Sequence, residues 1–160
     1  FWSQKKLNTC MRHTISHKAR IKRALMKRGG IKNYTPTDQV AKTWFTILNR
    51  SLFENKLKPV DIKVKRLRGC IGQLHMDWDG RYSKAGTCDQ SKLPYHNPTF
   101  GYKIELHNRF KTWKDFLETL AHEMVHQYQV EVQKDPYANH NSNFYAWREK
   151  FARYGMKLTL

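Results

Sequence analysis

His122-Glu123-Met124-Val125-His126 is the stretch on which the interpretation of the whole chain depends. Its two histidines are four residues apart, so on a helix they project from one face, one turn apart, and can bind a single metal ion. Glu123 is offset by one position. Its carboxylate therefore lies beside the metal rather than on it, where it can take a proton from water. The pattern indicates a catalytic metal site, although five residues can also match by chance.

The sequence around this stretch predicts a helix from about Thr112 to Gln133. Thr112 followed by Asp115 is typical of an N-cap with an acid in the first turn. Apolar residues then recur at spacings of three and four: Trp113, Phe116, Leu117, Leu120, Ala121, Met124, Val125 and Tyr128. Such a stripe is buried in an amphipathic helix, and both histidines lie at its border. We therefore expect both imidazoles at the edge of the core.

A catalytic zinc site usually has three protein ligands, so a third must come from elsewhere in the chain. His140 is the leading candidate, because the Pro-containing segment 134–139 breaks the helix and lets the chain turn back. Glu149, on a following helix, is the ligand that a gluzincin would use, and a site without a third protein ligand also stays open. Gln129 and Val132 stand where a metzincin has glycine and histidine, which excludes that subclass.

Four segments of the chain occur together in one family: Trp44 to Phe53, Cys70-Ile71-Gly72, Thr119 to His126, and His140 to Phe144. In combination they resemble the SprT-like zinc metalloproteases, the family that includes the Spartan DNA–protein-crosslink protease. The resemblance spans roughly Thr37 to Leu160. It implies a zincin-like SprT-type domain over residues 37–160, with a zinc cofactor and protein substrates.

The same resemblance implies zinc ligands at His122, His126 and His140, with Glu123 as the general base. Asn141 and Ser142 replace the Gly-Pro that usually follows the third histidine in the family. Many members also carry a C-terminal zinc ribbon with paired cysteines. The three cysteines here, Cys10, Cys70 and Cys88, have no metal-binding spacing, so we expect reduced thiols and the protease core alone.

The chain is strongly basic: its 30 Lys and Arg residues outnumber 13 acidic residues, for a net charge of +17. Such an excess attracts polyanions, so DNA is the expected partner, single-stranded or bound without regard to sequence. No apolar run is long enough to span a membrane and no secretory signal is present. We therefore expect no membrane partner and an intracellular location, in cytoplasm, nucleoid or nucleus, with a virus as suitable a source as a cell.

Residues 1–36 are predicted to form a basic arm or helix ahead of the domain, because residues 1–37 contain ten Lys or Arg and no acid. Ile15, Ala19, Lys22 and Met26 share one possible helical face, with Ile21 and Leu25 on its flank. The basic residues expected to contact phosphates are Lys18, Arg20, Lys22, Arg23, Lys27 and Arg28. A solvated arm, or a face packed on the domain, is the alternative.

The remaining patterns predict an α+β fold, in which a small antiparallel sheet packs against an N-terminal helix and the helix that carries the histidines. The N-terminal helix begins near Thr37 and ends around Asn55-Lys56. The expected strands are Val60 to Lys65, Cys70 to Met76 and Gly101 to His107, with a last helix over 144–154 and a terminal strand over 156–160. In such a fold the strand along the cleft pairs with extended substrate.

Two further groups of residues each have two interpretations. The long polar loop from Asp77 to Phe100 contains Trp78 and Arg81, which could stack on bases and hold phosphates, or form a surface insertion with Trp78 on the core. Tyr137 and Tyr145 are candidates to donate a hydrogen bond to a developing oxyanion, although simple packing explains either one as well.

Together these patterns predict a zinc-dependent metallopeptidase that acts on DNA-bound or DNA-crosslinked proteins. The alternative is a DNA-binding or packaging protein that uses a zincin scaffold with little or no proteolysis. Glu123 argues against this alternative, because a purely structural zinc site needs no base. A metallopeptidase for ordinary soluble substrates is a third hypothesis.

Overall fold

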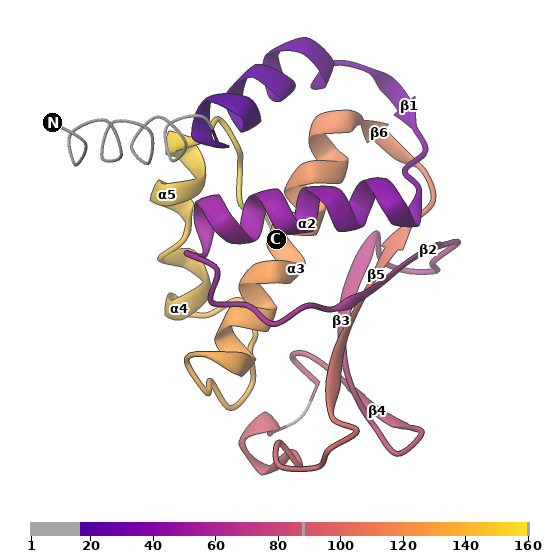
Figure 1. Ribbon diagram of the computed structural model, residues 1–160, viewed down its shortest axis with the longest axis vertical. Coiled ribbons are helices and arrows are strands. Elements are labelled where there is room, and N and C mark those ends of the chain that lie inside the picture. The colour runs from indigo at the N-terminus through magenta and orange to yellow at the C-terminus, as the bar shows by residue number, and fades with distance from the viewer. Residues whose placement is uncertain (1–16, 88, 160) are drawn as a thin grey trace, which may run out of the picture.

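The computed structural model describes residues 17–87 and 89–159, so Cys10, Ile15, Cys88 and Leu160 lie outside the described residues. In chain order the elements are a helix over residues 17–28, β1 (Lys32–Tyr34), α2 (Asp38–Leu52), β2 (Asp61–Lys65), β3 (Gly72–Trp78), β4 (Arg81–Lys84), the 3-10 helix η1 (Gln90–Lys92), β5 (Gly101–His107), β6 (Phe110–Thr112), α3 (Trp113–Glu131), α4 (Ser142–Tyr145) and α5 (Arg148–Arg153). Helices α2 and α3 pack beside a small sheet (Figure 1), which is the predicted α+β arrangement.

The two long helices begin at the caps that the sequence predicts. The Thr37 hydroxyl accepts a hydrogen bond from the Val40 amide (3.1 Å), and the Thr112 hydroxyl accepts one from the Asp115 amide (3.1 Å). Helix α2 ends at Leu52, before the predicted Asn55-Lys56, because the chain turns there through two residues with positive φ. Buried aromatic and aliphatic side chains from both helices form the core between them.

The four-stranded sheet has the order β2-β5-β3-β4 and is mixed rather than antiparallel. Strand β2 pairs in parallel with β5, from Asp61 opposite Lys103 to Lys65 opposite His107. This corrects the predicted antiparallel sheet. The physical reason is that the β3–β4 hairpin and the long connection after it bring the chain back to run beside β2 in the same direction.

Strand β4 lies in the segment Asp77 to Phe100, which was predicted to be a long polar loop. It pairs with β3 through a two-residue turn, Asp79-Gly80, in which both residues have positive φ (47° and 76°). Asp-Gly between short strands is a strong hairpin signal, so this turn could have been predicted from the sequence. Trp78 is half-buried at the end of β3, where its ring stacks near Phe100 with centroids 6.1 Å apart.

The basic segment is helical over residues 17–28, and this helix packs on the body of the protein. Ile21 is fully buried, whereas Met26 is 88% exposed. The predicted apolar face with Ala19, Lys22 and Met26 is therefore wrong, and the buried face includes Ile21, which was placed on the flank. Beyond the helix, β1 pairs with β6 and so attaches this segment to the start of α3.

The C-terminal part differs from the predicted single helix and strand. It forms two short helices, α4 and α5, because Trp147 lies at the break between them and packs on Phe53 and Tyr128. The centroid of its ring lies 4.7 Å from that of Phe53 and 5.0 Å from that of Tyr128. Residues 156–159 are not a strand. The Lys157 amide instead donates to the Glu118 carboxylate (2.5 Å), which fixes this tail along α3. Among the described residues, no helix combines the length and apolar character needed to cross a bilayer.

Candidate metal centre

Three histidines converge at the middle of α3. His122 and His126 project from this helix one turn apart, and His140 reaches them from the loop between α3 and α4. The Nε2 atom of His122 lies 3.2 Å from Nε2 of His126 and 3.2 Å from Nε2 of His140. All three potential ligand atoms lie within 4.8 Å of one another. The structure therefore brings His140 to the two histidines on the helix.

This geometry suits a tetrahedral zinc ion. Two nitrogens at typical Zn–N distances from one tetrahedral ion are about 3.3 Å apart, close to the spacing found here. Burial lowers the pKa of His122 to about 3 and the pKa of His126 to about 4, so both imidazoles are neutral at physiological pH. A neutral imidazole has the free lone pair that a metal requires. The three histidines thus could hold zinc, with a fourth position open to water or substrate.

Gln129 determines which nitrogen of His126 carries the proton. Its amide nitrogen donates to the carbonyl of Asn139 (3.0 Å) and lies 3.3 Å from the carboxylate of Asp135, and both of these groups only accept. The amide oxygen of Gln129 therefore faces Nδ1 of His126, at 2.8 Å, and accepts a hydrogen bond from its N–H. This leaves the lone pair of His126 on Nε2, directed at the other two histidines.

The loop that carries His140 is held against α3 by hydrogen bonds around the buried side chain of Asp135. The Asp135 carboxylate accepts hydrogen bonds from the side chains of Asn141 (2.7 Å) and Asn143 (3.2 Å). Burial raises the pKa of Asp135, but these hydrogen bonds outweigh that effect and hold the pKa below its usual value. Asn141 also caps α4 by accepting from the Phe144 amide (3.2 Å). Asn141 therefore both stabilises the loop that carries His140 and caps the helix that follows it.

Replacing Gln129 with leucine is expected to lower zinc affinity by about 10- to 100-fold, the usual cost of losing a group that orients a metal ligand. Gln127→Leu is the matched control, because Gln127 is also buried on α3 but donates to the carbonyl of Lys58 (3.0 Å), away from the histidines. Competition against a chromophoric chelator measures the affinity. Equal zinc affinity in both variants would contradict the role of Gln129.

Glu123 lies beside the histidines in a cleft of about 370 Å³. The cleft is bordered by the start of β3, by residues 84–87, by α3 and by residues 138–140. The Glu123 side chain is buried, and burial raises its pKa to about 8. A carboxylate with a pKa near the working pH can both accept and return a proton. Strand β4 pairs with β3 only from His75 to Trp78, so the Gly72–Gln73 edge of β3 faces the cleft.

The comparison with protein families identifies the group to which this chain belongs. A model of the SprT-like family matches residues 41–159. The chain belongs to the SprT-like family. The match includes most of α2, the four-stranded sheet, all three histidines and Glu123, whereas a search of curated proteins finds no match. A zincin-like metalloprotease domain is what this family membership implies.

Gly72, in the Cys70-Ile71-Gly72 segment of this SprT-like chain, lies against Glu123, the candidate general base. A β-carbon at Gly72 would be 2.8 Å from Cγ2 of Thr119 and 3.3 Å from Oε1 of Glu123. Only glycine lets the strand approach α3 so closely. The close approach explains why this position has no side chain.

The Gly72→Ala variant is expected to lose at least about tenfold in peptidase activity and about 1–3 kcal/mol of unfolding free energy, because the added methyl overpacks the contact with α3. Gly101→Ala is its control, since a β-carbon at Gly101, at the start of β5, meets no atom within 4 Å. Thermal unfolding and peptide hydrolysis measure the two effects. Equal results for the two alanine variants would show that the close approach is unimportant.

Several other predicted residues lie away from the cleft of this SprT-like protein. Glu149, the alternative third ligand, is exposed and pairs with Arg153 (2.9 Å), so it does not reach the histidines. Tyr137 is exposed, and Tyr145 lies under the guanidinium of Arg148 (4.3 Å). Neither tyrosine lines the cleft, and the oxyanion role stays a prediction for both.

The structure also adds residues that the sequence analysis did not single out. Lys84 lines the cleft from β4, and Gln129 and Asp135 support the histidines from behind. In the sequence, Gln129 was informative only because it departs from the metzincin pattern. The available signal was a glutamine one turn after the second histidine, but its partners lie on a loop whose path the sequence does not specify.

Proposed function

We propose that this protein is a zinc-dependent peptidase. The observation that carries the proposal is the convergence of three histidine Nε2 atoms beside Glu123 in one cleft. When bound, zinc would supply a Lewis acid that makes water a better nucleophile and polarises the scissile carbonyl. His122, His126 and His140 would hold it.

The remaining steps belong to side chains of this chain. Glu123 would accept the proton of the attacking water on its carboxylate and return it to the leaving amine. Its buried setting keeps bulk water from competing for this proton. The Gly72–Gln73 edge of β3 has backbone groups available at the cleft, and an extended substrate would pair with them as an added strand.

The substrate class that we propose is protein bound or crosslinked to DNA. The net charge of +17 supports this class, because it attracts DNA at a long range and without sequence preference. Tethering on DNA would raise the local concentration of any protein held on the same strand.

Cleavage of a DNA-bound protein, and self-cleavage, with and without single-stranded DNA tests this function. The zinc-loaded protein is expected to cut faster when DNA is present, and chelation of zinc should abolish cleavage. Cleavage that DNA does not accelerate would indicate a peptidase for ordinary soluble substrates. If the zinc-loaded protein still binds DNA but cleaves nothing, the proposed peptidase function is overturned. A DNA-binding or packaging protein would then be the remaining function.

A further inference from the structure

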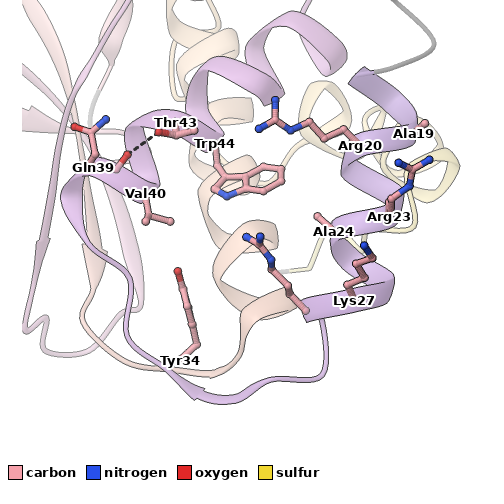
Figure 2. A pocket seen from close by; sticks show the side chains of 11 residues that line it. Ala19, Arg20, Arg23, Ala24, Lys27, Tyr34, Gln39, Val40, Thr43 and Trp44 are labelled. Carbon is pink, nitrogen blue, oxygen red and sulfur yellow. Dashed lines mark hydrogen bonds between the residues drawn. The ribbon is translucent and has the colours of Figure 1, made fainter.

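A groove of about 790 Å³ lies between the helix over residues 17–28 and α2 (Figure 2). Its helix side is lined by Arg20, Arg23, Lys27 and Arg28. Thr43 and Trp44 of α2 line the opposite side. Six basic residues of this segment were predicted to contact phosphates, and the fold brings four of them to one groove. Lys18 instead lies over the ring of Tyr154, 5.4 Å from its centroid.

The positive charge of this groove is not neutralised within the part of the chain that the structure describes. No acidic residue lines the groove, and none of its four basic side chains forms an ion pair with a described carboxylate. Asp38, the nearest acid in sequence, instead accepts from the Val64 amide (2.8 Å) and pairs with Lys63 (3.9 Å). Four like charges around one hollow repel each other, and a bound polyanion would relieve that repulsion.

The helix that carries these charges is held in place from both ends of the segment. Ile21 anchors it in the core, and the pairing of Lys32 with Thr112 and of Tyr34 with Phe110 fixes the strand that follows. The four basic side chains therefore start from a fixed backbone. A ligand that binds them does not have to order the segment, which lowers the entropic cost of binding.

The spacing of the basic residues favours a ligand with repeated negative charges. Arg20, Arg23 and Lys27 are three and four residues apart and so follow one face of the helix. They span about 10 Å of its axis at 1.5 Å per residue. That length corresponds to about three nucleotide steps of 3.4 Å along one DNA strand. A single phosphate could engage only part of this row.

An anionic membrane is the other polyanion that basic helices bind, but this helix lacks the required apolar face. Membrane-surface helices insert a broad apolar face beside their basic residues. Here Ile21 is buried in the protein, and Met26 is the exposed large apolar side chain of the helix. One methionine does not make such a face, so nucleic acid is the better ligand.

The groove and the cleft with the histidines lie on different parts of the molecule. The groove and the cleft share no lining residue. In Figure 1 the helix over residues 17–28 is at the top, whereas β3 lies in the lower half. DNA in the groove would leave the cleft open. We propose that this groove binds the phosphodiester backbone of DNA, independently of sequence, and holds the protein beside substrates on the same DNA.

The test compares Arg20→Gln/Arg23→Gln with Arg66→Gln/Arg68→Gln, which removes the same charge from exposed residues between β2 and β3. Fluorescence anisotropy measures binding to a labelled single strand and to the matching duplex over a series of salt concentrations. The groove variant is expected to bind about tenfold more weakly, with a salt slope smaller by about 1.4 on the single strand or about 1.8 on the duplex. The control should stay within about twofold.

Equal weakening in both double variants, or in neither, would overturn the groove as the binding site. Binding to phosphatidylserine vesicles without binding to DNA would overturn the assignment of DNA as the ligand. We assign DNA because the proposed function places protein substrates on it, but binding requires no cleavage. Zinc-dependent hydrolysis of a short peptide without DNA should be equal in the groove variant and the wild type, so loss of DNA binding and loss of peptidase activity are separate results.

Discussion

Replacing Glu123 with glutamine is expected to lower the rate of peptide hydrolysis by about 10²- to 10⁴-fold while zinc stays bound. Glutamine has nearly the same shape but cannot accept a proton. Burial already raises the pKa of Glu123 to about 8, which favours the neutral carboxyl that glutamine resembles. The unfolding temperature should therefore be equal to that of the wild type or slightly higher.

Single-turnover hydrolysis, together with zinc content measured on the same samples, separates the proton-transfer role from metal loss. The hydrolysis rates of the two proteins are compared only when each contains one equivalent of zinc. A Glu123→Gln protein that retains hydrolysis within about tenfold of the wild type would refute Glu123 as the base. Loss of zinc along with activity would instead assign the residue a role in metal binding.

The His140→Ala variant is expected to lose more than about 100-fold in zinc affinity, because even residues that only orient a ligand contribute 10- to 100-fold. His140 lies on an exposed loop, so its truncation leaves the core intact. Peptidase activity at limiting zinc should fall with the affinity. A chelator competition titration measures the first effect, and hydrolysis at fixed free zinc measures the second.

Two variants serve as controls for His140. His96→Ala removes another exposed histidine, which lines a separate hollow beside Tyr95 and Lys134. Glu149→Ala removes the alternative ligand, which pairs with Arg153. Both should bind zinc as the wild type does. Unchanged affinity in His140→Ala together with a loss in Glu149→Ala would show that the third ligand is the glutamate.

Features that depend on neighbouring residues could be predicted from the sequence. Helix caps and helical apolar spacing are local features, because a helix is formed by hydrogen bonds and contacts between residues three and four apart. They include the caps at Thr37 and Thr112 and the apolar spacing of α2 and α3. Helix α3 was expected from about Thr112 to Gln133 and runs over Trp113–Glu131. The same local rule places His122 and His126 on one face with Glu123 beside them.

Features that depend on distant partners were predicted less well. The parallel pairing of β2 with β5 depends on the path of the chain between them, whereas the residue pattern of a strand does not specify the direction of its neighbour. The break between α4 and α5 occurs where Trp147 packs on Phe53, which is far away in the sequence. Helical periodicity does not predict that contact.

The amino-acid pattern was enough to predict a helix with two histidines and a glutamate on one side, a third histidine shortly after it, and a large excess of positive charge. The folded structure was needed to show that Nε2 of His140 lies 3.2 Å from Nε2 of His122 and that Gln129 orients His126. It was also needed to show that Arg20 and Arg23 line one groove. The physical reason is that helical spacing follows from bonded geometry, whereas these contacts depend on how a loop and a helix pack against segments far from them in the chain.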